Sequence, residues 1–399
     1  VRLTLDDVAR ANVAVADEPP PATATRVETW HARIVFLALV AGLVGLDARE
    51  IEALDARAWA RWLDEIDGFD DLERRRVWHA AYERRHEDMV LRGLASHRRA
   101  APLAPRPHVS AQVFFCIDER EESMRRAVEE VDPTVEIFGA AGFFGVAVNY
   151  QGLDDPGTVA LCPIVITPQH AVVERPRAED VDLHARRTAR RRLIGRLSRW
   201  LHVSSRSLLR GWISTAALGL LTVVPLVGRV LAPRAFGRLR TWLNDRFLPE
   251  PRTELSLMRE DTETQERMAG LLHGFRVEEK AACVASVLAP AGLTHRFARL
   301  IVILGHGSTS LNNPHESAYD CGACGGRRGG PNARLLAAMA NRPGVREHLR
   351  AQGIDIPDTT WFVGGYHDTC SDDVQLLDPE GLPATHAPDL ARLRSVLED

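Results

Sequence analysis

The chain has 399 residues, of which 45% are hydrophobic and 26% charged, with a formal net charge of −4. This length allows a sizeable core in two or three domains, and the small negative charge argues against a general nucleic-acid-binding protein. Six cysteines over this length indicate a reduced, cytosolic protein rather than one held together by disulfides.

Residues 1–100 are predicted to form a helical N-terminal region. Apolar residues recur at helical spacing over 51–66 and 72–97, and arginine and glutamate occupy the intervening positions. Three prolines between Ala101 and Pro107 cannot continue a helix, so a boundary is expected there.

The first half of an α/β core is predicted over 108–180. The apolar run Val113–Phe115 is typical of a buried strand, and the acidic run from Asp118 is typical of a first helical turn. Cys116 therefore stands at the carboxyl end of a strand, where open α/β sheets place their ligands. Strand alternation puts Cys116, Asp118 and Arg120 on one side, as a metal ligand, a second ligand or base, and a charge partner. A buried structural cysteine is the alternative.

Two further segments of this half are expected to be ordered around the same core. In Gly139–Val146 the small residues would let the backbone approach a site, and the aromatic residues would form the walls of a narrow apolar pocket. Such a pocket suits a small nonpolar substrate, although the same residues are common in turns and cores. The stretch Cys162–Pro168 is predicted to be a strand.

A helical, arginine-rich insertion is predicted over 181–298. No Asp or Glu occurs from Leu183 to Asn244, and arginines flank the apolar run Trp212–Val227. This combination is typical of an element that docks on a membrane surface or a membrane partner. The run is shorter than the ~20 residues of a spanning helix and contains Pro225. A buried helical hairpin, or a surface facing a membrane partner, is therefore favoured over a spanning helix.

The second half of the α/β core is predicted over 299–399. Leu300–Leu304 is wholly apolar, as in a strand covered on both faces, and it leads into Gly305-His306-Gly307-Ser308. Cys321 follows on a glycine-rich loop. Strands separated by long helical inserts predict a mostly parallel sheet with helices on both faces.

The two halves together offer a ligand set for a metal ion. Two thiolates, an imidazole and a carboxylate suit tetrahedral Zn2+, and the candidates are Cys116, Asp118, His306 and Cys321. Cys324 forms a Cys-x-x-Cys with Cys321, so both sulfurs could bind the metal, or the two could form a redox pair.

Four stretches resemble the DabA subunits of two-component inorganic-carbon transporters, whose catalytic centre is similar to that of β-carbonic anhydrases. These stretches are Phe115–Arg120, Gly305–Ser308, Asn312–Gly326 and Phe362–Thr369. The resemblance covers roughly residues 110–375 and implies a β-carbonic anhydrase-like core. It also implies that the zinc ligands are Cys116, Asp118, His306 and Cys321, with Cys321 favoured over Cys324. DabA proteins are considerably longer than this chain. Ordinary β-carbonic anhydrases use a short His-x-x-Cys spacing, so the separation of His306 from Cys321 fits only the transporter branch.

The resemblance implies a zinc-dependent subunit of an energy-coupled uptake complex for CO2 and bicarbonate. A zinc-bound water that ionises near pH 7 would supply the hydroxide that attacks CO2. By the same similarity, Arg120 pairs with Asp118 and pulls it off the metal, which makes both residues catalytic. The implied partner is a polytopic, cation-coupled, DabB-like membrane subunit, on which activity depends. The expected location is peripheral, on the cytoplasmic face of the cell membrane, and no nucleic acid is expected as a partner.

Two other classes of function stay open from the sequence. One is a different zinc hydrolase, in which the glycine-rich loop binds an anion. The other is a non-catalytic, metal-bound scaffold that docks on a membrane protein through the arginine-rich region. The pairing of Asp118 with Arg120 favours the hydratase, because a purely structural site would need only Cys and His ligands.

Overall fold

The computed structural model describes residues 35, 39–43, 45–100, 108–257, 267–268, 270–310 and 315–398. The chain forms two compact units, Val1–Pro105 and Arg106–Asp399. The helices of the first unit are α3 (Ala48–Glu52), α4 (Ala56–Gly68) and α5 (Asp71–Ala100). The described part of the predicted helical region is thus mostly helical, while residues 1–34, 36–38 and 44 of that prediction lie outside the described residues.

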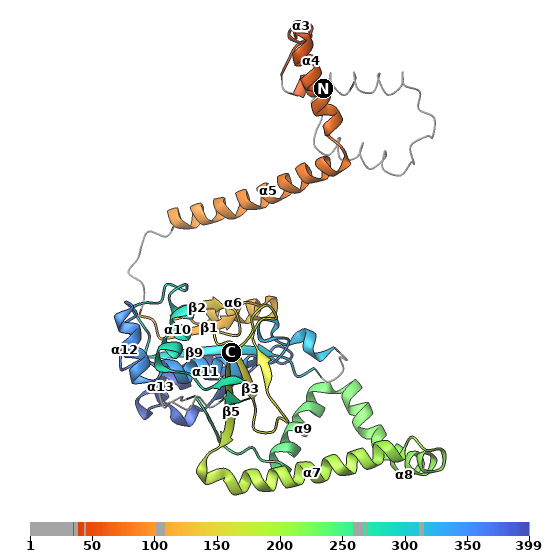
Figure 1. Cartoon of the computed structure of the whole chain (residues 1–399), viewed down its shortest axis with the longest axis vertical. Coiled ribbons are helices and arrows are strands. Elements are labelled where there is room, and N and C mark those ends of the chain that lie inside the picture. The colour runs from red at the N-terminus through yellow and green to blue at the C-terminus, as the bar shows by residue number, and fades with distance from the viewer. Residues whose placement is uncertain are drawn as a thin grey trace. The chain divides into compact units, whose positions relative to one another are not determined.

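A five-stranded sheet forms the centre of the second unit (Figure 1). Its strands are β1 (Ala111–Cys116), β2 (Val135–Ala140), β9 (Leu300–Gly307), β10 (Trp361–Asp368) and β11 (Asp373–Leu377), in the order β11-β10-β9-β1-β2. All neighbouring pairs are parallel except β10 with β11. The prediction of an α/β fold with a mostly parallel sheet is confirmed. Strands from before and after the helical insertion meet in this one sheet.

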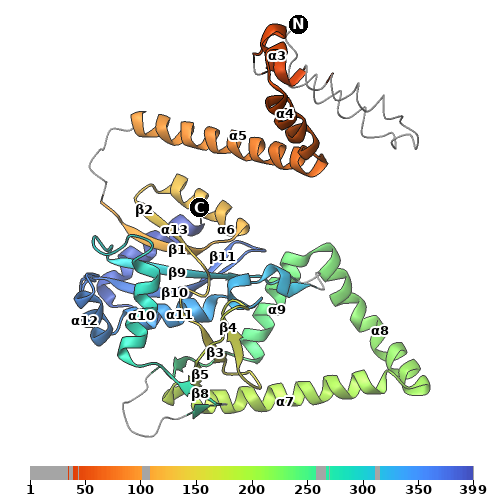
Figure 2. The same ribbon diagram turned by 45° about the horizontal axis from the view of Figure 1, so that its top comes forward.

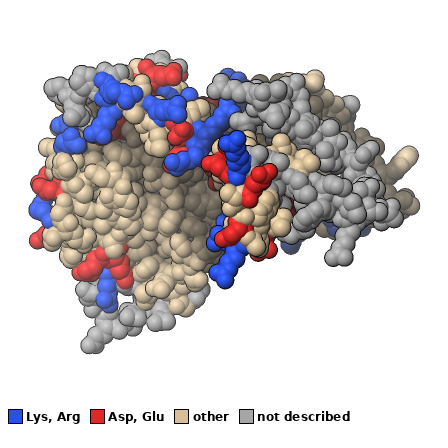
Figure 3. Space-filling model, turned by 90° about the horizontal axis from the view of Figure 1, so that it is seen from above, with Lys and Arg blue, Asp and Glu red and all other residues tan. Residues whose placement is uncertain are grey.

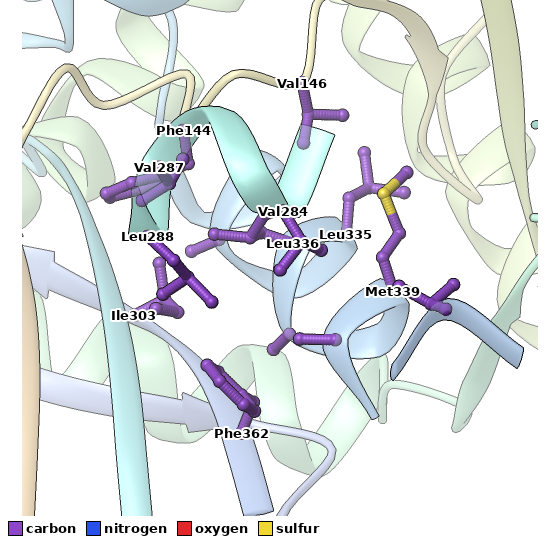
Figure 4. Packing of buried hydrophobic residues seen from close by; sticks show 14 of the residues in the cluster. Phe144, Val146, Val284, Val287, Leu288, Ile303, Leu335, Leu336, Met339 and Phe362 are labelled. Atoms are coloured by element: carbon purple, nitrogen blue, oxygen red, sulfur yellow. The ribbon is translucent and has the colours of Figure 1, made fainter. Parts of the chain in front are cut away.

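Helices cover both faces of this sheet. One face packs on α6 (Glu119–Val131) and α13 (Ala387–Glu398), and the other on α10 (Val277–Leu288), α11 (Gly330–Ala340) and α12 (Pro343–Ala351). Alternation along β9 explains this, because Ile301 and Ile303 belong to one apolar cluster and Leu300, Val302 and Leu304 to the other. Figure 4 shows Ile303 among side chains of α10 and α11.

A second, mixed sheet lies beyond α11. Its strands are β3 (Val148–Gln151), β4 (Val159–Leu161), β5 (His170–Pro176), β7 (Arg267–Met268) and β8 (Leu271–His273), in the order β4-β3-β5-β8-β7, and β6 (Thr253–Leu255) pairs with β5. The predicted strand Cys162–Pro168 is wrong, because this stretch is a loop with Ile164 98% exposed and Val165 88% exposed. Prolines at 163 and 168 cannot donate the ladder hydrogen bonds of a central strand.

The helical insertion leaves the second sheet after β5 and returns to it at β6. Its helices are α7 (Val181–Ser204), α8 (Leu208–Leu231) and α9 (Pro233–Phe247), preceded by the short η1 (Ala178–Asp180). Most side chains of α8 are exposed, so the alternative of a buried helical hairpin is wrong for this chain. Among the described residues, no single helix is long and apolar enough to cross a membrane. Together, the two halves Leu208–Gly219 and Leu221–Leu231 are long and apolar enough to cross one, by length and composition alone, but a bend of 61° separates them.

Arg334 of α11 connects the two sheets through a nearly buried guanidinium. Its Nε and one terminal nitrogen donate to both carboxylate oxygens of Asp378, at 2.5 and 2.7 Å. The other terminal nitrogen donates to Glu174 of β5 at 2.6 Å, and a backbone oxygen of Thr253 accepts a further bond. Because Asp378 follows β11 and Glu174 lies in β5, this one side chain fixes the position of α11 between the sheets.

The Arg334→Leu variant is therefore expected to lose about 3 kcal/mol of unfolding free energy, because two partly buried carboxylates lose their cationic partner. The free energy is measured by urea unfolding followed by tryptophan fluorescence. The control is Arg350→Leu, which removes an exposed pair with Asp355 and is expected to change stability little. Equal stability of the two variants would contradict the structural role of Arg334.

Candidate metal centre

Cys116 and His306 lie at the carboxyl ends of two neighbouring strands. Cys116 is the last residue of β1, and His306 is the last residue but one of β9. The two strands are parallel and hydrogen-bonded to each other, so their carboxyl ends meet at the same edge of the sheet. Both side chains are buried, with 4% of Cys116 and 1% of His306 exposed. The sheet thus brings together two residues that are 190 positions apart in the sequence.

Cys321 is brought to the same place by a tight loop between η2 (Glu316–Tyr319) and η3 (Gly322–Cys324). Its backbone N–H donates to the carbonyl of Arg327, and its own carbonyl accepts from Cys324. The loop turns at Gly325, whose φ of +69° is the left-handed conformation that glycine adopts at little cost. The result is a fully buried Cys321 side chain.

The three side chains form a compact set of metal donors. The sulfurs of Cys116 and Cys321 are 3.8 Å apart, and these sulfurs and a ring nitrogen of His306 all lie within 4.8 Å of one another. Neither ring nitrogen of the buried His306 has a hydrogen-bond partner among the residues that the structure describes. Because a buried imidazole without partners is costly, a bound cation would satisfy it. The structure therefore places together three of the four predicted ligands.

Asp118 lies beside this set but is bound to Arg120. The guanidinium donates to both carboxylate oxygens, at 2.7 and 2.9 Å, and the backbone N–H of Arg120 adds a third bond at 3.0 Å. Hydrogen bonds from Arg120 lower the pKa of Asp118 to about 2. One oxygen of Asp118 is 3.6 Å from Nε2 of His306. Asp118 also caps the N-terminus of α6, so the local fold keeps the carboxylate at the edge of the donor set.

Cys324 lies next to the donor set and completes a buried sulfur cluster with Cys116 and Cys321. Hydrogen bonds from Cys116 and Cys324 lower the pKa of Cys321. The pKa of Cys324 is raised, because it donates to Cys321 and is buried. Cys324 thus lies beside Cys116 and Cys321 in the cluster, while the described donor atoms that lie within 4.8 Å of one another are those of Cys116, His306 and Cys321.

Gly142 closes one side of the donor set, and the sequence did not single it out. A Cβ atom at this position would lie 2.5 Å from the sulfur of Cys321 and 2.6 Å from that of Cys116. The backbone therefore approaches the two sulfurs as closely as only glycine allows. The sequence predicted such an approach for Gly139–Val146 as a whole. Which residue of that stretch lies against the sulfurs depends on the turn after β2.

A buried acid–imidazole pair lies behind the donor set. Glu121 of α6 is 1% exposed, and its carboxylate is 2.5 Å from Nδ1 of the fully buried His367. Burial lowers the pKa of His367, but hydrogen bonds to Glu121 and Asp372 outweigh it and raise that pKa. His367 is the register partner of His306 across the ladder between β10 and β9. His367 lies in the stretch Phe362–Thr369 that carries the family resemblance, but the sequence offered no sign that Glu121 is buried.

The comparisons with known proteins agree on one family. Residues 1–399 match the family model described as "Probable inorganic carbon transporter subunit DabA". A relative of that description from Sorangium cellulosum, DabA 2, is 46% identical over 385 residues, which is 95% of this chain and 36% of the relative. DabA 1 of the same organism is 49% identical over 350 residues, covering 86% and 33%. The Methylococcus capsulatus relative is 42% identical over 344 residues, covering 85% and 32%.

The chain thus spans about a third of the length of these curated relatives. No solved structure matches it. Because the family model covers the whole chain and relatives of the same description align over most of it, the chain belongs to the DabA family of probable inorganic carbon transporter subunits.

Proposed function

We propose that this chain carries the zinc centre of an inorganic-carbon uptake complex and hydrates CO2 to bicarbonate. The observation that supports this most is the convergence of Cys116, His306 and Cys321 beside a carboxylate held by an arginine. The family supports the wider function, inorganic carbon transport. The ligand identities, the chemistry and the partner are part of the proposal.

The donor set fits zinc better than the other common cations. Two thiolates and an imidazole are soft and borderline ligands, which magnesium and calcium avoid and zinc prefers. Three protein ligands with a fourth position left over are typical of catalytic zinc sites rather than structural ones. When bound, a zinc ion would act as a Lewis acid and lower the pKa of a water molecule to near 7.

Asp118 and Arg120 control the fourth position in this proposal. While Arg120 holds both carboxylate oxygens, Asp118 is kept from the cation and the position stays available to water. If the pair separates, Asp118 can become the fourth ligand, because it already lies 3.6 Å from the imidazole of His306. The pair therefore acts as a gate with an open and a closed arrangement.

A surface cavity leads toward the proposed centre. Its volume is about 500 Å3, and it is lined in part by Cys116, Asp118, Glu121 and Gly139. CO2 is small and apolar, so a cavity with Cys116 in its lining can admit it without a large opening.

The wider setting of the proposal follows the family. Its name describes a subunit, which implies a partner in a complex. We propose a polytopic, cation-coupled, DabB-like membrane subunit as that partner, and the cytoplasmic face of the cell membrane as the location. In this proposal CO2 and bicarbonate are the species handled, and hydration proceeds only while the membrane partner is bound.

The ligand set is tested by the zinc content of the purified chain. Wild type is expected to hold one zinc per chain, and Cys116→Ala, His306→Ala and Cys321→Ala are each expected to lose it, because each removes one of three donors. Elemental analysis after dialysis measures this.

Two cysteine variants serve as controls. Cys324→Ala keeps all three donors, and Cys370→Ala changes an exposed cysteine outside the cluster. Both are expected to retain zinc. A wild-type protein without zinc, or loss of zinc only in Cys324→Ala, would overturn the proposed ligands and the hydratase mechanism with them.

A further inference from the structure

The helices α7, α8 and α9 form a three-sided excursion from the body of the second unit. Figures 1 and 2 both show α7 extending away from the sheets, α8 at the far side and α9 returning. Over residues 189–200, every side chain of α7 is exposed. The excursion is therefore supported at its two ends, where Arg187 binds Asp154 and the carbonyl of Leu248.

The middle helix presents apolar side chains on a wide face. Its exposed residues include Leu208 and Leu209, Trp212 and Ile213, Val223 and Val224, Leu226 and Val227, and Val230 and Leu231. Each pair is consecutive in sequence, and consecutive helical residues point about 100° apart. A protein groove covers a single stripe of a helix, as in helix-in-groove complexes. A face this wide matches an apolar medium better than a groove.

The flanking helices carry unbalanced positive charge. No acidic residue occurs from Leu183 to Asn244, whereas on the face drawn in Figure 3 positive and negative side chains are interspersed. Exposed arginines stand on all three helices, and within the described part of the chain none of the following pairs with an acid: Arg192, Arg196, Arg199, Arg210, Arg234, Arg238 and Arg240. Charge of this kind complements an anionic surface.

Each helix of the excursion also exposes a tryptophan. Trp200 of α7, Trp212 of α8 and Trp242 of α9 are 62%, 82% and 61% exposed. Tryptophan is enriched where an apolar layer meets a polar one, because its ring is apolar and its N–H needs a partner. Three such side chains next to arginines and aliphatic residues are typical of a membrane-interface element.

We infer that the excursion binds an anionic lipid bilayer directly, with α8 in the acyl boundary and the arginines of α7 and α9 at the headgroups. The two halves of α8 are about 18 and 17 Å long and meet at a bend of 61°, so each is shorter than the ~30 Å hydrocarbon core. The inference rests on the membrane location in the proposed function but not on the metal centre. Lipid, rather than the membrane subunit, would then supply part of the attachment.

This mode of binding would also place the metal centre close to the membrane. In Figures 1 and 2 the junction of α8 and α9 lies beside the segment that carries η2 and η3. Cys321 lies between η2 and η3, and Cys324 is the last residue of η3. Binding of the excursion to lipid would keep the donor set near the membrane from which CO2 diffuses.

The test is flotation of the purified chain with vesicles. Wild type is expected to float with vesicles of phosphatidylcholine and phosphatidylglycerol in equal parts, and to bind pure phosphatidylcholine at least about tenfold more weakly. The combined variant Trp212→Gln, Ile213→Gln and Val224→Gln is expected to bind at least about a hundredfold more weakly, because three exposed apolar side chains no longer enter the bilayer. A second combined variant replaces three arginines of α7, Arg192→Gln, Arg196→Gln and Arg199→Gln. Its binding to the mixed vesicles is expected to be about a hundredfold weaker than that of wild type, because three positive charges no longer meet the anionic headgroups.

The matched control makes three similar changes on α5, where Leu72, Tyr82 and Met89 are 74%, 75% and 63% exposed, each to Gln. It should bind like wild type. No flotation of wild type, or an equal loss of binding in the control, would overturn the inference and indicate that this face binds a protein partner instead.

Zinc content is measured in the same samples. Lost flotation with full zinc contradicts only the lipid inference, while retained flotation without zinc contradicts only the proposed hydratase. The comparison of the two wild-type lipid mixtures holds even if a variant fails to fold.

Discussion

The Arg120→Ala variant is expected to keep one zinc per chain and to lose CO2 hydration by about a hundredfold or more. Arg120 makes three hydrogen bonds to Asp118 and none to the proposed metal donors. Without them Asp118 is free to approach His306 and take the fourth position. Hydration is measured as oxygen-isotope exchange between CO2 and water, in membranes from cells that express the protein together with the proposed membrane subunit.

Two further variants show whether the gate or the charge matters. Arg120→Lys keeps the charge but loses the two-pronged contact with both carboxylate oxygens, so an intermediate rate is expected. Arg126→Ala removes another arginine of α6, one that is not in the lining of the cavity beside Cys116, and should leave the rate unchanged. Loss of zinc from Arg120→Ala would contradict the gate, because it would show that Arg120 is needed to build the site rather than to open it.

The Gly142→Val variant is expected to lose the metal although it changes no ligand. Even the Cβ atom would lie 2.5 and 2.6 Å from the sulfurs of Cys321 and Cys116, so both sulfurs must move. Since tetrahedral thiolate coordination tolerates only small changes in distance, zinc affinity should fall about a hundredfold or more. A competition titration with a chromophoric zinc chelator measures the affinity.

The control for this effect is Gly322→Ala in the loop next to Cys321. A Cβ atom there has no heavy atom within 4 Å, so the variant should keep the wild-type affinity. Unchanged affinity in Gly142→Val would show that the two sulfurs do not share a metal ion. Reduced affinity in both variants would show that any change near the loop is harmful, and would remove the special role of Gly142.

The fold class could be predicted from the sequence because its evidence is local. The wholly apolar run Leu300–Leu304 and the shorter run Val113–Phe115 each need cover on both faces, and only a layered α/β arrangement supplies it. The stretch Cys162–Pro168 shows the limit of such reasoning. Its apolar residues have strand propensity, but prolines at both ends and the turn from Pro163 to Ile166 make it an exposed loop.

The candidate site could be predicted in part, for a related reason. Metal-competent side chains directly after two apolar strands are visible in the sequence, and parallel strands bring their carboxyl ends together. Glu121 could not be found in this way, because an acid in the first turn of a helix is usually solvated. It is buried here only because β10 lies beside β9 and carries His367 over α6.

The sequence by itself thus determined the α/β class, the family and the residues Cys116, His306 and Cys321 as candidates, since each depends on a short local pattern. Only the tertiary structure decided how those residues lie relative to one another. Strand pairing between β1 and β9 brings Cys116 and His306 together, and the loop before η3 adds Cys321, so the three donor atoms lie within 4.8 Å of one another. Asp118 caps α6 and is bound by Arg120, and the backbone at Gly142 lies close to the two sulfurs. The exposure of α8 was decided in the same way, because whether an apolar helix is buried depends on what the rest of the chain packs against it.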